Sequence, residues 1–399
     1  MTQIGFVGLG KMGGNMVHRI KRDSEHEVVA FDFDKDAVQR AASDGAIGAG
    51  TLASLVKKLA PPRLVWIMVP AGDPTEQTVQ KLSKLLQRGD TIIDGGNSKW
   101  TDDKRRAAEM SKLGIHYVDV GTSGGVWGLT VGYCMMVGGP PTAVRRLAPI
   151  LDVLAPTTNE QSIAAIGPRG WLHFGPAGAG HYVKMVHNGV EYGLMQAYAE
   201  GFDVFDKCEY ELDNAKIAHL WGQGSVVRSW LCELAARAFE ADGNELANIE
   251  GYTEDSGEGR WTIEDATAHD VPTPALTAAL QSRFYSRGNG DFTHRLLAAL
   301  RNQFGGHAVK AAGADSKTSK PAAAKANTAK PAAAKAASRR TASKAATTPK
   351  ASRRTASKAA STPKASRRTA SKAATTPKAS SRRSTSGPAV AKTKGSAKR

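Results

Sequence analysis

The chain has 399 residues and a net charge of +17, but the positive charge is concentrated in one segment. Residues 311–399 hold 23 of the 54 Lys and Arg residues and one of the 37 acids, which leaves 31 basic and 36 acidic groups in residues 1–310. All Trp, Tyr and Phe residues precede residue 311, so a packed core is expected only there. Three widely spaced cysteines argue against a disulfide-stapled protein, and no leader-like or membrane-spanning run is found, so we expect a cytoplasmic location and no membrane partner.

Short β-branched runs alternate with helical patterns from residue 3 to about residue 165. The runs lie at Ile4–Val7, Val28–Asp32, Leu64–Val69, Thr91–Asp94, Ile115–Val120 and Tyr133–Val137. Helical periodicity lies between them, for example over Met12–Lys21 and Glu76–Leu86. This alternation predicts an α/β Rossmann domain with a doubly wound, mostly parallel sheet over residues 1–167. Beyond it, stretches rich in Ala and Leu predict an all-helical domain for substrate binding and dimerisation over residues 168–310.

Residues 311–399 consist mainly of Ala, Lys, Ser, Thr, Arg and Pro. A 14-residue unit repeats over 337–350, 351–364 and 365–378. Without aromatic residues this tail cannot bury enough apolar surface to fold, and we expect it to be disordered. Its net charge of +22 suits binding of nucleic acid without sequence preference, or of another polyanion. A solubilising appendage is the alternative, and composition alone does not decide between them.

A glycine-rich turn, Gly8-Leu9-Gly10-Lys11-Met12-Gly13, follows the first predicted strand and opens the first predicted helix. Glycines at this spacing permit a tight turn and let the backbone approach a pyrophosphate at the helix N-terminus. Asp32 ends the second strand, where a carboxylate accepts hydrogen bonds from ribose hydroxyls and repels a 2′-phosphate. Since Phe33 brings no cation, the pattern predicts NAD, with NADP as second choice. We expect Asp34 to cap the next helix rather than to contact the cofactor.

Four polar residues, Lys184, His187, Asn188 and Glu191, recur at the spacing of one helix face. Their neighbours are apolar or small, which argues against an ordinary solvated face. Two loops follow predicted strands and carry Asn97 and the segment Ser123-Gly124-Gly125. Doubly wound sheets bind ligands beyond the carboxyl ends of their strands, so both loops are candidates for the site, with ordinary turn chemistry as the alternative.

In these segments the chain resembles the decarboxylating 6-phosphogluconate dehydrogenases, in particular their shorter bacterial type. The matching segments are G-L-G-K-M-G at 8–13, I-I-D-G-G-N-S at 92–98, S-G-G at 123–125, G-A-G-H-Y-V-K-M-V-H-N-G-V-E-Y at 178–192, W-T at 261–262 and R-N-Q-F-G-G-H at 301–307. The resemblance covers residues 1–307. The related 3-hydroxyacid dehydrogenases share the Gly-rich turn, the S-G-G loop and the Lys-x-x-x-Asn spacing but lack His187 and Glu191-Tyr192, and they are the alternative enzyme class.

The resemblance implies oxidative decarboxylation of 6-phosphogluconate to ribulose 5-phosphate and CO₂, a reaction of the pentose phosphate pathway. Lys184 would take the proton of the substrate 3-hydroxyl and then polarise the 3-keto group, and Glu191 would protonate C1 of the enediol. A β-keto acid loses CO₂ readily once its carbonyl is polarised, so no metal is expected. To act as a base, Lys184 needs a pKa lowered by burial or by nearby cations.

The resemblance also assigns the binding residues. Those for the cofactor are Gly8, Leu9, Gly10, Met12, Gly13, Asp32, Val69 and Asn97. Those for the sugar acid are Asn97, Ser123, Gly124, Gly125, His187, Asn188, Tyr192, Arg260, Thr262, Arg283, Arg301 and His307. Arg301 and His307 would come from a second subunit, which implies a homo-oligomer, either a dimer or a tetramer. Longer members of the family have Lys where this chain has Arg260, which keeps the charge but changes the geometry.

Overall fold

The computed structural model describes residues 1–156, 170–305 and 308–309. All of them belong to one compact unit, Met1–Asp315. Two expectations therefore lie outside the described residues: the place of His307 and the disorder of the basic tail over 311–399.

One mixed sheet forms the core of the first part of the chain. Its strands are β1 (Gln3–Val7), β2 (Glu27–Phe31), β3 (Ile47–Gly48), β4 (Leu64–Ile67), β5 (Thr91–Asp94), β6 (His116–Ser123), β7 (Cys134–Gly138) and β8 (Trp171–Gly175). They lie in the order β3-β2-β1-β4-β5-β6-β7-β8. Every neighbouring pair is parallel except β6 and β7. The doubly wound, mostly parallel sheet expected from the sequence is confirmed.

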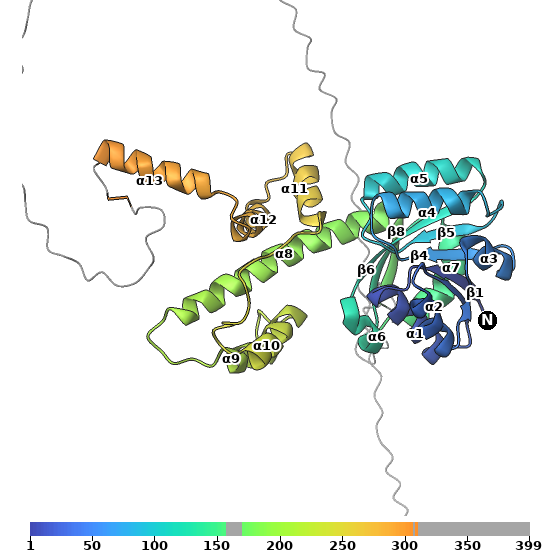
Figure 1. The fold of residues 1–399 in the computed structure, drawn as a ribbon, viewed down its shortest axis with the longest axis horizontal. Helices are drawn as coiled ribbons and strands as arrows, with labels where there is room; N and C mark the ends of the chain where they lie inside the picture. Colours follow the sequence, from blue (N-terminus) through green and yellow to red (C-terminus); the bar gives the residue numbers. More distant parts are fainter. Residues whose placement is uncertain (157–169, 306–307, 310–399) are drawn as a thin grey trace, which may run out of the picture. The chain divides into compact units, whose positions relative to one another are not determined.

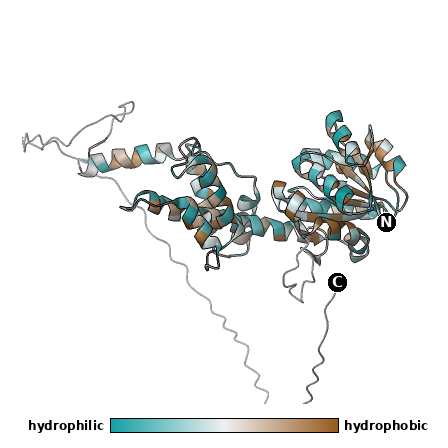
Figure 2. Ribbon diagram, turned by 90° about the horizontal axis from the view of Figure 1, so that it is seen from below, coloured by the Kyte–Doolittle hydropathy of each residue, from teal (hydrophilic) through white to brown (hydrophobic). Residues whose placement is uncertain are grey.

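Helices cover both faces of this sheet, because alternate residues of each buried strand point to opposite sides. On β1, Ile4 and Phe6 join the core under α1 (Lys11–Asp23), α2 (Lys35–Ser43) and α7 (Pro141–Leu154). Val7 joins the core on the other face, under α3 (Leu52–Lys58), α4 (Asp73–Ser83) and α5 (Trp100–Lys112). Figure 2 shows hydrophobic residues gathered on the strands and on the helix sides that face them.

Two strands were not expected from the sequence. Ile47 of β3 is exposed, so this two-residue strand has no apolar pattern to detect. In β8 the large apolar residues Leu172 and Phe174 are exposed, while His173 is half-buried. The strand therefore lacks the inward apolar alternation that marks a half-buried strand. As a correction to the expected boundary at 167/168, the range assigned to the all-helical domain contains the last strand of the sheet.

The rest of the described chain is helical and is arranged around α8 (Ala179–Asp206), the long helix in Figure 1. Its helices are α9 (Asn214–Gly222), α10 (Trp230–Asp242), α11 (Glu258–Ala268), α12 (Pro274–Ser286) and α13 (Asp291–Gly305). Phe202 and Phe205 of α8 pack with Trp221 of α9 and Phe239 of α10. None of the helices in the described part of the chain combines the length and the apolar character that crossing a membrane requires.

Candidate active site

The glycine-rich turn combines tight packing at two positions with open space at the third. Gly8 has φ +95°, and a Cβ there would lie 2.4 Å from the Met68 carbonyl oxygen. A Cβ on Gly13 would lie 2.1 Å from the carbonyl oxygen of Gly8, whereas nothing lies within 4 Å of a Cβ on Gly10. No side chain caps the N-terminus of α1 at Gly10. Open space beside uncapped N–H groups fits the pyrophosphate of a dinucleotide.

Asp32 is fixed at the end of β2 by two backbone N–H groups. Its carboxylate accepts hydrogen bonds from Leu9 N at 2.6 Å and from Asp34 N at 2.9 Å. Gly8, Gly10, Asp32 and Val69 line one cavity of about 420 Å³. Asp34 caps α2 by accepting a hydrogen bond from Asp36 N, as expected. Leu9 and Gly13 are buried beside this cavity, so they shape the turn rather than line the cavity.

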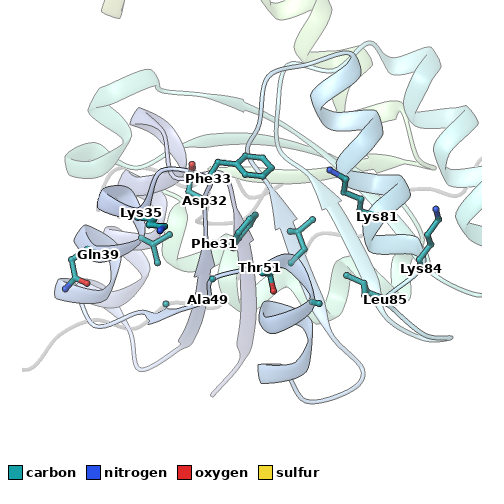
Figure 3. Close-up of a pocket in the computed structure, with 15 residues that line it drawn as sticks. Phe31, Asp32, Phe33, Lys35, Gln39, Ala49, Thr51, Lys81, Lys84 and Leu85 are labelled. Atoms are coloured by element: carbon teal, nitrogen blue, oxygen red, sulfur yellow. The ribbon is translucent and has the colours of Figure 1, made fainter.

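A neighbouring pocket of about 730 Å³ is also lined by Asp32. Figure 3 shows Asp32, Phe33 and Lys35 on one side of it, and Lys81 of α4 and Lys84 directly after that helix on the other. The Phe33 side chain is 84% exposed. Sequence reasoning considered only the residue after Asp32 and missed these lysines, which the fold brings in from another helix. The pocket beside the dinucleotide cavity is therefore lined by one carboxylate and several cations.

A second cleft, of about 940 Å³, brings together residues from both parts of the chain. Its lining includes Met12, Asn97, Ser123, Gly124, Gly125, Lys184, His187, Asn188 and Glu191. The four polar residues that were predicted to share one helix face thus lie on α8, and they face the two predicted loops. Met12 faces this cleft instead of the dinucleotide cavity. Ser229, Trp230, Leu231 and Leu234, at the start of α10, complete the wall and were not singled out from the sequence.

Lys184 is the buried cation of this cleft, with an exposed fraction of 7%. Its Nζ donates a hydrogen bond to Asn188 Oδ1 at 2.7 Å. Burial lowers the pKa of Lys184 below its usual value of 10.5, against the opposing effect of the Glu191 charge. This is the direction that a general base requires, because a lowered pKa increases the fraction of neutral amine.

His187 connects the two sides of the cleft. Its Nδ1 lies 2.9 Å from Asn188 Oδ1, and because an amide oxygen only accepts, Nδ1 carries the proton. In the neutral ring Nε2 is then the acceptor, and it lies 3.4 Å from Ser123 Oγ. A carboxylate oxygen of Glu191 lies 3.8 Å from Nδ1. The imidazole of His187 therefore links the loop that carries Ser123 to α8.

Three glycines bring α8 close enough to the sheet to bury Lys184. A Cβ on Gly121 of β6 would lie 2.3 Å from Lys184 Cβ. A Cβ on Gly138 of β7 would lie 2.7 Å from Gly180 N, and a Cβ on Gly180 would lie 2.4 Å from Met136 O. Any side chain at these positions would push the helix away from the strands. The glycines therefore fix the depth of this cleft.

A buried ion-pair network holds the first turn of α8. His181 Nδ1 lies 2.7 Å from a carboxylate oxygen of Asp103, and Asp119 accepts hydrogen bonds from Gly178 N and His181 N. Burial alone would lower the pKa of His181, but the Asp103 charge raises it to about 10. Sequence reasoning missed this network, although His181 lies one turn before Lys184 on the same helix.

The same network supports the Asn97 loop. Asp94 accepts hydrogen bonds from Gly96 N at 3.1 Å and from Ser98 Oγ at 2.7 Å, on either side of Asn97. Asp94, Asp103 and His181 offer ligand atoms within 4.8 Å of one another, as a metal site would. However, Tyr117 Oη lies within hydrogen-bond distance of both carboxylates, at 2.9 and 3.1 Å, and Arg106 lies 3.3 Å from Asp94, so these oxygens already have partners. The chemistry of the cluster is that of an ion-pair network.

The expected phosphate ligands lie apart from the lining of this cleft. The guanidinium carbon of Arg283 sits 3.4 Å from the centre of the Tyr192 ring. Arg260 forms a paired contact with Asp255 at 2.7 and 2.9 Å. Thr262 Oγ1 lies 2.8 Å from the carbonyl oxygens of Met185 and Glu258, so its hydroxyl joins α11 to α8. Arg301 is exposed on α13.

Sequence comparisons assign both parts of the chain to one family. Residues 3–167 match the NAD binding domain of 6-phosphogluconate dehydrogenase, and residues 180–294 and 209–321 match its C-terminal domain. The NAD(+)-dependent, decarboxylating 6-phosphogluconate dehydrogenase of Haloferax volcanii is 43% identical over 307 residues, which cover 77% of this chain and 98% of that protein. The enzyme of the same description from Bacillus subtilis is 34% identical, over 71% of this chain and 61% of its own length.

Among solved structures, that of Plasmodium falciparum 6-phosphogluconate dehydrogenase is similar, with a TM-score of 0.63 and 27% identity. The match covers 78% of this chain and 67% of that chain, which was studied in its apo form and in complex with NADP+ and with 6-phosphogluconate. The match to the C-terminal domain favours this family over the 3-hydroxyacid dehydrogenases, because it falls where the two classes differ. The chain is an oxidoreductase with a nicotinamide dinucleotide binding domain, and it belongs to the 6-phosphogluconate dehydrogenase family.

Proposed function

We propose that this protein oxidises 6-phosphogluconate at C3 and decarboxylates it to ribulose 5-phosphate. The observation that carries the proposal is the buried Lys184, bonded to Asn188 and placed beside His187 and Glu191 in a cleft that also contains Asn97 and Ser123. A buried amine with a lowered pKa is suited to removing a proton from a hydroxyl group. The alternative 3-hydroxyacid chemistry would not require His187 and Glu191.

Lys184 and Glu191, both on α8, carry out two different proton transfers. Lys184 removes the 3-hydroxyl proton as a hydride leaves C3, and the resulting ammonium polarises the 3-keto oxygen while CO₂ departs. A bound nicotinamide supplies the hydride acceptor. Glu191, one helical turn beyond Asn188, then delivers a proton to C1 of the resulting enediol, which was C2 of the sugar acid before CO₂ left. Asn97, Ser123, Gly124, Gly125, His187 and Asn188 hold the sugar acid in this arrangement.

For the cofactor we propose NAD, with NADP as second choice. The support is Asp32, whose carboxylate is already fixed by Leu9 N and Asp34 N at the place where a ribose would lie. Lys35, Lys81 and Lys84 line the neighbouring pocket and reduce the penalty for a 2′-phosphate. No step of the proposed reaction requires a metal. We also propose a reducing, cytoplasmic location, and the support is that three widely spaced cysteines offer no disulfide framework.

The test is absorbance at 340 nm with purified full-length protein, 6-phosphogluconate and each cofactor in turn. We expect reduction of NAD, release of CO₂, and a higher kcat/KM with NAD than with NADP. If a folded protein that binds dinucleotide reduces neither cofactor, the proposed substrate is wrong. A higher kcat/KM with NADP would overturn only the assignment of Asp32.

We also propose that the phosphate site is completed by a second subunit. Tyr192, Arg260 and Arg283 would contribute from one chain, and Arg301 and His307 from its partner. The support is α13, where Phe292, Leu296, Leu297 and Leu300 are exposed, so no described residue covers this apolar face and another chain could bind there. The number of subunits, two or four, would follow from light scattering.

A mixing experiment tests shared sites. Lys184→Ala and Arg301→Ala proteins should each be inactive, but co-refolded mixtures should regain activity, because hybrid oligomers contain one site with neither substitution. Mixtures without activity, in which mass spectrometry shows that hybrids have formed, would contradict sharing. Mixtures of each variant with itself are the control.

For the tail we propose binding of nucleic acid or another polyanion without sequence preference. The support is compositional: 23 Lys and Arg residues against one acid over residues 311–399. Band shifts of the full chain and of a chain ending at residue 310 would be compared with DNA, RNA and polyphosphate over a range of salt. Equal affinity of the two chains would exclude the tail as the binding element. A steep loss of binding with salt is expected for the full chain only.

A further inference from the structure

Trp127 and Arg237 form a contact between the two parts of the chain at the edge of the active-site cleft. Trp127 ends the short 3-10 helix η1 (Gly125–Trp127), directly after the Ser123–Gly125 loop. The guanidinium carbon of Arg237, on α10, lies 4.5 Å from the centre of the Trp127 ring. This is the geometry of a cation–π interaction. Among the described residues the Arg237 side chain has no other recorded polar or ring partner.

The loop before Trp127 contains two glycines with positive φ angles. Gly124 has φ +132° and Gly125 has φ +51°, and nothing lies within 4 Å of a Cβ on Gly125. Because these two residues have no side chains, the loop makes fewer anchoring contacts of its own, and contacts from neighbouring residues contribute more to its position. The position of the loop matters because its residues line the cleft opposite Lys184.

On one side, α1 holds the chain that follows the loop. Asn15 Nδ2 donates a hydrogen bond to Val126 O at 3.3 Å. Arg19 donates to the Leu129 carbonyl at 3.2 Å, within α6 (Gly128–Val131). These contacts attach the segment to the helix that opens the dinucleotide site. They do not involve the helical part of the chain.

On the other side, α10 is the element that reaches the loop. Its far end is anchored by Phe239 in the aromatic cluster with Phe202 of α8. Its first turns contribute Trp230, Leu231 and Leu234 to the cleft wall. Arg237 lies between the anchored end and the cleft wall, and it makes the ring contact with Trp127. The stacked pair therefore links the wall formed by α10 to the loop that carries Ser123.

We propose that Trp127 and Arg237 are positioning residues, which hold the Ser123–Gly125 loop and the start of α10 together and thereby set the affinity for the sugar acid. The inference rests on the proposed function of the cleft. Neither side chain lines the cleft, so neither is expected to touch the reacting atoms. Loss of the pair should loosen one wall, raise the KM for 6-phosphogluconate, and leave kcat and the dissociation constant for NAD nearly unchanged.

The experiment uses the full chain with Arg237→Ala, Trp127→Leu, the double variant and Trp127→Phe. Each of the first two should raise the KM for 6-phosphogluconate about two- to fivefold, the size expected for one exposed cation–π contact. The double variant should be no worse than either single variant, because both remove the same interaction. Trp127→Phe keeps an aromatic face and should restore much of the wild-type KM. Arg145→Ala, an exposed arginine on α7, is the control for lost charge.

Three results would overturn the inference. An unchanged KM in Arg237→Ala would show that the contact has no role. A raised KM in Arg237→Ala with a normal one in Trp127→Leu, or additive effects in the double variant, would show that Arg237 acts on the substrate by charge. Absence of activity with 6-phosphogluconate in the wild-type protein would instead refute the proposed function. The wild-type protein is therefore measured first in the same assay. Thermal unfolding of each variant separates these effects from misfolding, and the exposure of both side chains makes misfolding a small risk.

Discussion

The Nζ of Lys184 lies 2.7 Å from Asn188 Oδ1, one helical turn further along α8. The same oxygen lies 2.9 Å from His187 Nδ1, so a single amide accepts from both side chains. This arrangement holds the lysine nitrogen in one place without a carboxylate in direct contact. An adjacent carboxylate would stabilise the charged ammonium and make the loss of its proton more difficult. Asn188 positions the amine without adding such a charge.

Replacing Lys184 with Ala should remove the base while leaving the dinucleotide site intact. We expect kcat to fall by about 10²- to 10⁴-fold or more, the usual contribution of a general base. NAD binding should change little, since Lys184 does not line the cavity formed by Gly8, Gly10 and Asp32. Turnover at 340 nm and calorimetric titration with NAD measure the two effects, and Lys216→Ala serves as an exposed control. Loss of both turnover and NAD binding would indicate a structural role.

Asn188→Asp should place a negative charge against the Lys184 amine. An adjacent carboxylate favours the charged form of lysine, so it should raise the pKa that burial now lowers. Neutral Lys184 is the active form, and the acidic limb of kcat/KM against pH should therefore move to higher pH. Asn188→Ala, which removes the acceptor without adding charge, should not cause this shift. Identical profiles for the Asp and Ala variants would argue that the limb belongs to another group.

The parts of the site that the sequence predicted depend on short-range periodicity. Helical spacing predicts that the polar residues from Lys184 to Glu191 share one helix face. A strand–turn–helix pattern predicts that Gly8, Gly10 and Asp32 belong to the dinucleotide site. Both patterns depend on residues that are close together in the sequence, and both are present in the folded protein. Asn97 and Ser123 required one further rule, that the carboxyl ends of parallel strands share an edge.

The parts that the sequence did not predict are tertiary pairings. Nothing in the spacing of Asp103 and His181 indicates that they meet in a buried ion pair. In the same way Arg260, expected to be free for phosphate, is held by Asp255, and Thr262 bonds to the backbone of α8. These contacts depend on how separate helices pack, and sequence spacing does not encode that packing.

Gly10→Ala should weaken cofactor binding, whereas Gly13→Ala should lower the Tm, although both change one glycine of the same turn. The added methyl at Gly10 meets no protein atom within 4 Å, so folding should be unaffected, but it enters the space left for a pyrophosphate. We expect a normal Tm and an NAD dissociation constant raised by about tenfold or more, which corresponds to ~1.4 kcal/mol. At Gly13 the methyl would clash with Gly8 O, and the Tm should fall. Equal Tm losses in both variants would contradict this assignment.

Cofactor preference should respond to Asp32 and Phe33 together. Asp32→Ala removes the charge that repels a 2′-phosphate, and Phe33→Arg adds a guanidinium that can pair with it. We expect the double variant to prefer NADP, with Lys35, Lys81 and Lys84 providing further attraction in the neighbouring pocket. The ratio of kcat/KM values for the two cofactors is the measurement, and Asp36→Ala is a control for charge alone. An unchanged ratio would mean that ribose recognition lies elsewhere.

The buried pair of His181 and Asp103 should make stability depend on pH. The pKa of His181 is raised to about 10 in the folded protein, whereas an unfolded histidine has an ordinary value of 6.5. Between these values the folded state keeps a proton that the unfolded state has lost, so the free energy of unfolding should fall as pH rises. The stabilisation is complete below about pH 6.5 and is lost through about pH 10, with a slope of at most ~1.4 kcal/mol per pH unit.

Urea unfolding between pH 6.5 and 9.5 should reveal this slope in the wild-type protein and a flatter one in the double variant His181→Gln/Asp103→Asn. Both residues are replaced because removing His181 alone would raise the pKa of Asp103, already about 6, further into this pH range. His181→Gln alone should be less stable than the wild-type protein at neutral pH, by about 3–5 kcal/mol, because it leaves Asp103 buried without its histidine partner. His219→Gln is the matched control: His219 pairs with Glu240 at 2.6 Å, but both side chains are exposed, so solvent screens the interaction and the slope should persist. If the double variant retained the wild-type slope, the titrating group would be another one, and the pair would hold α8 by hydrogen bonding rather than by charge.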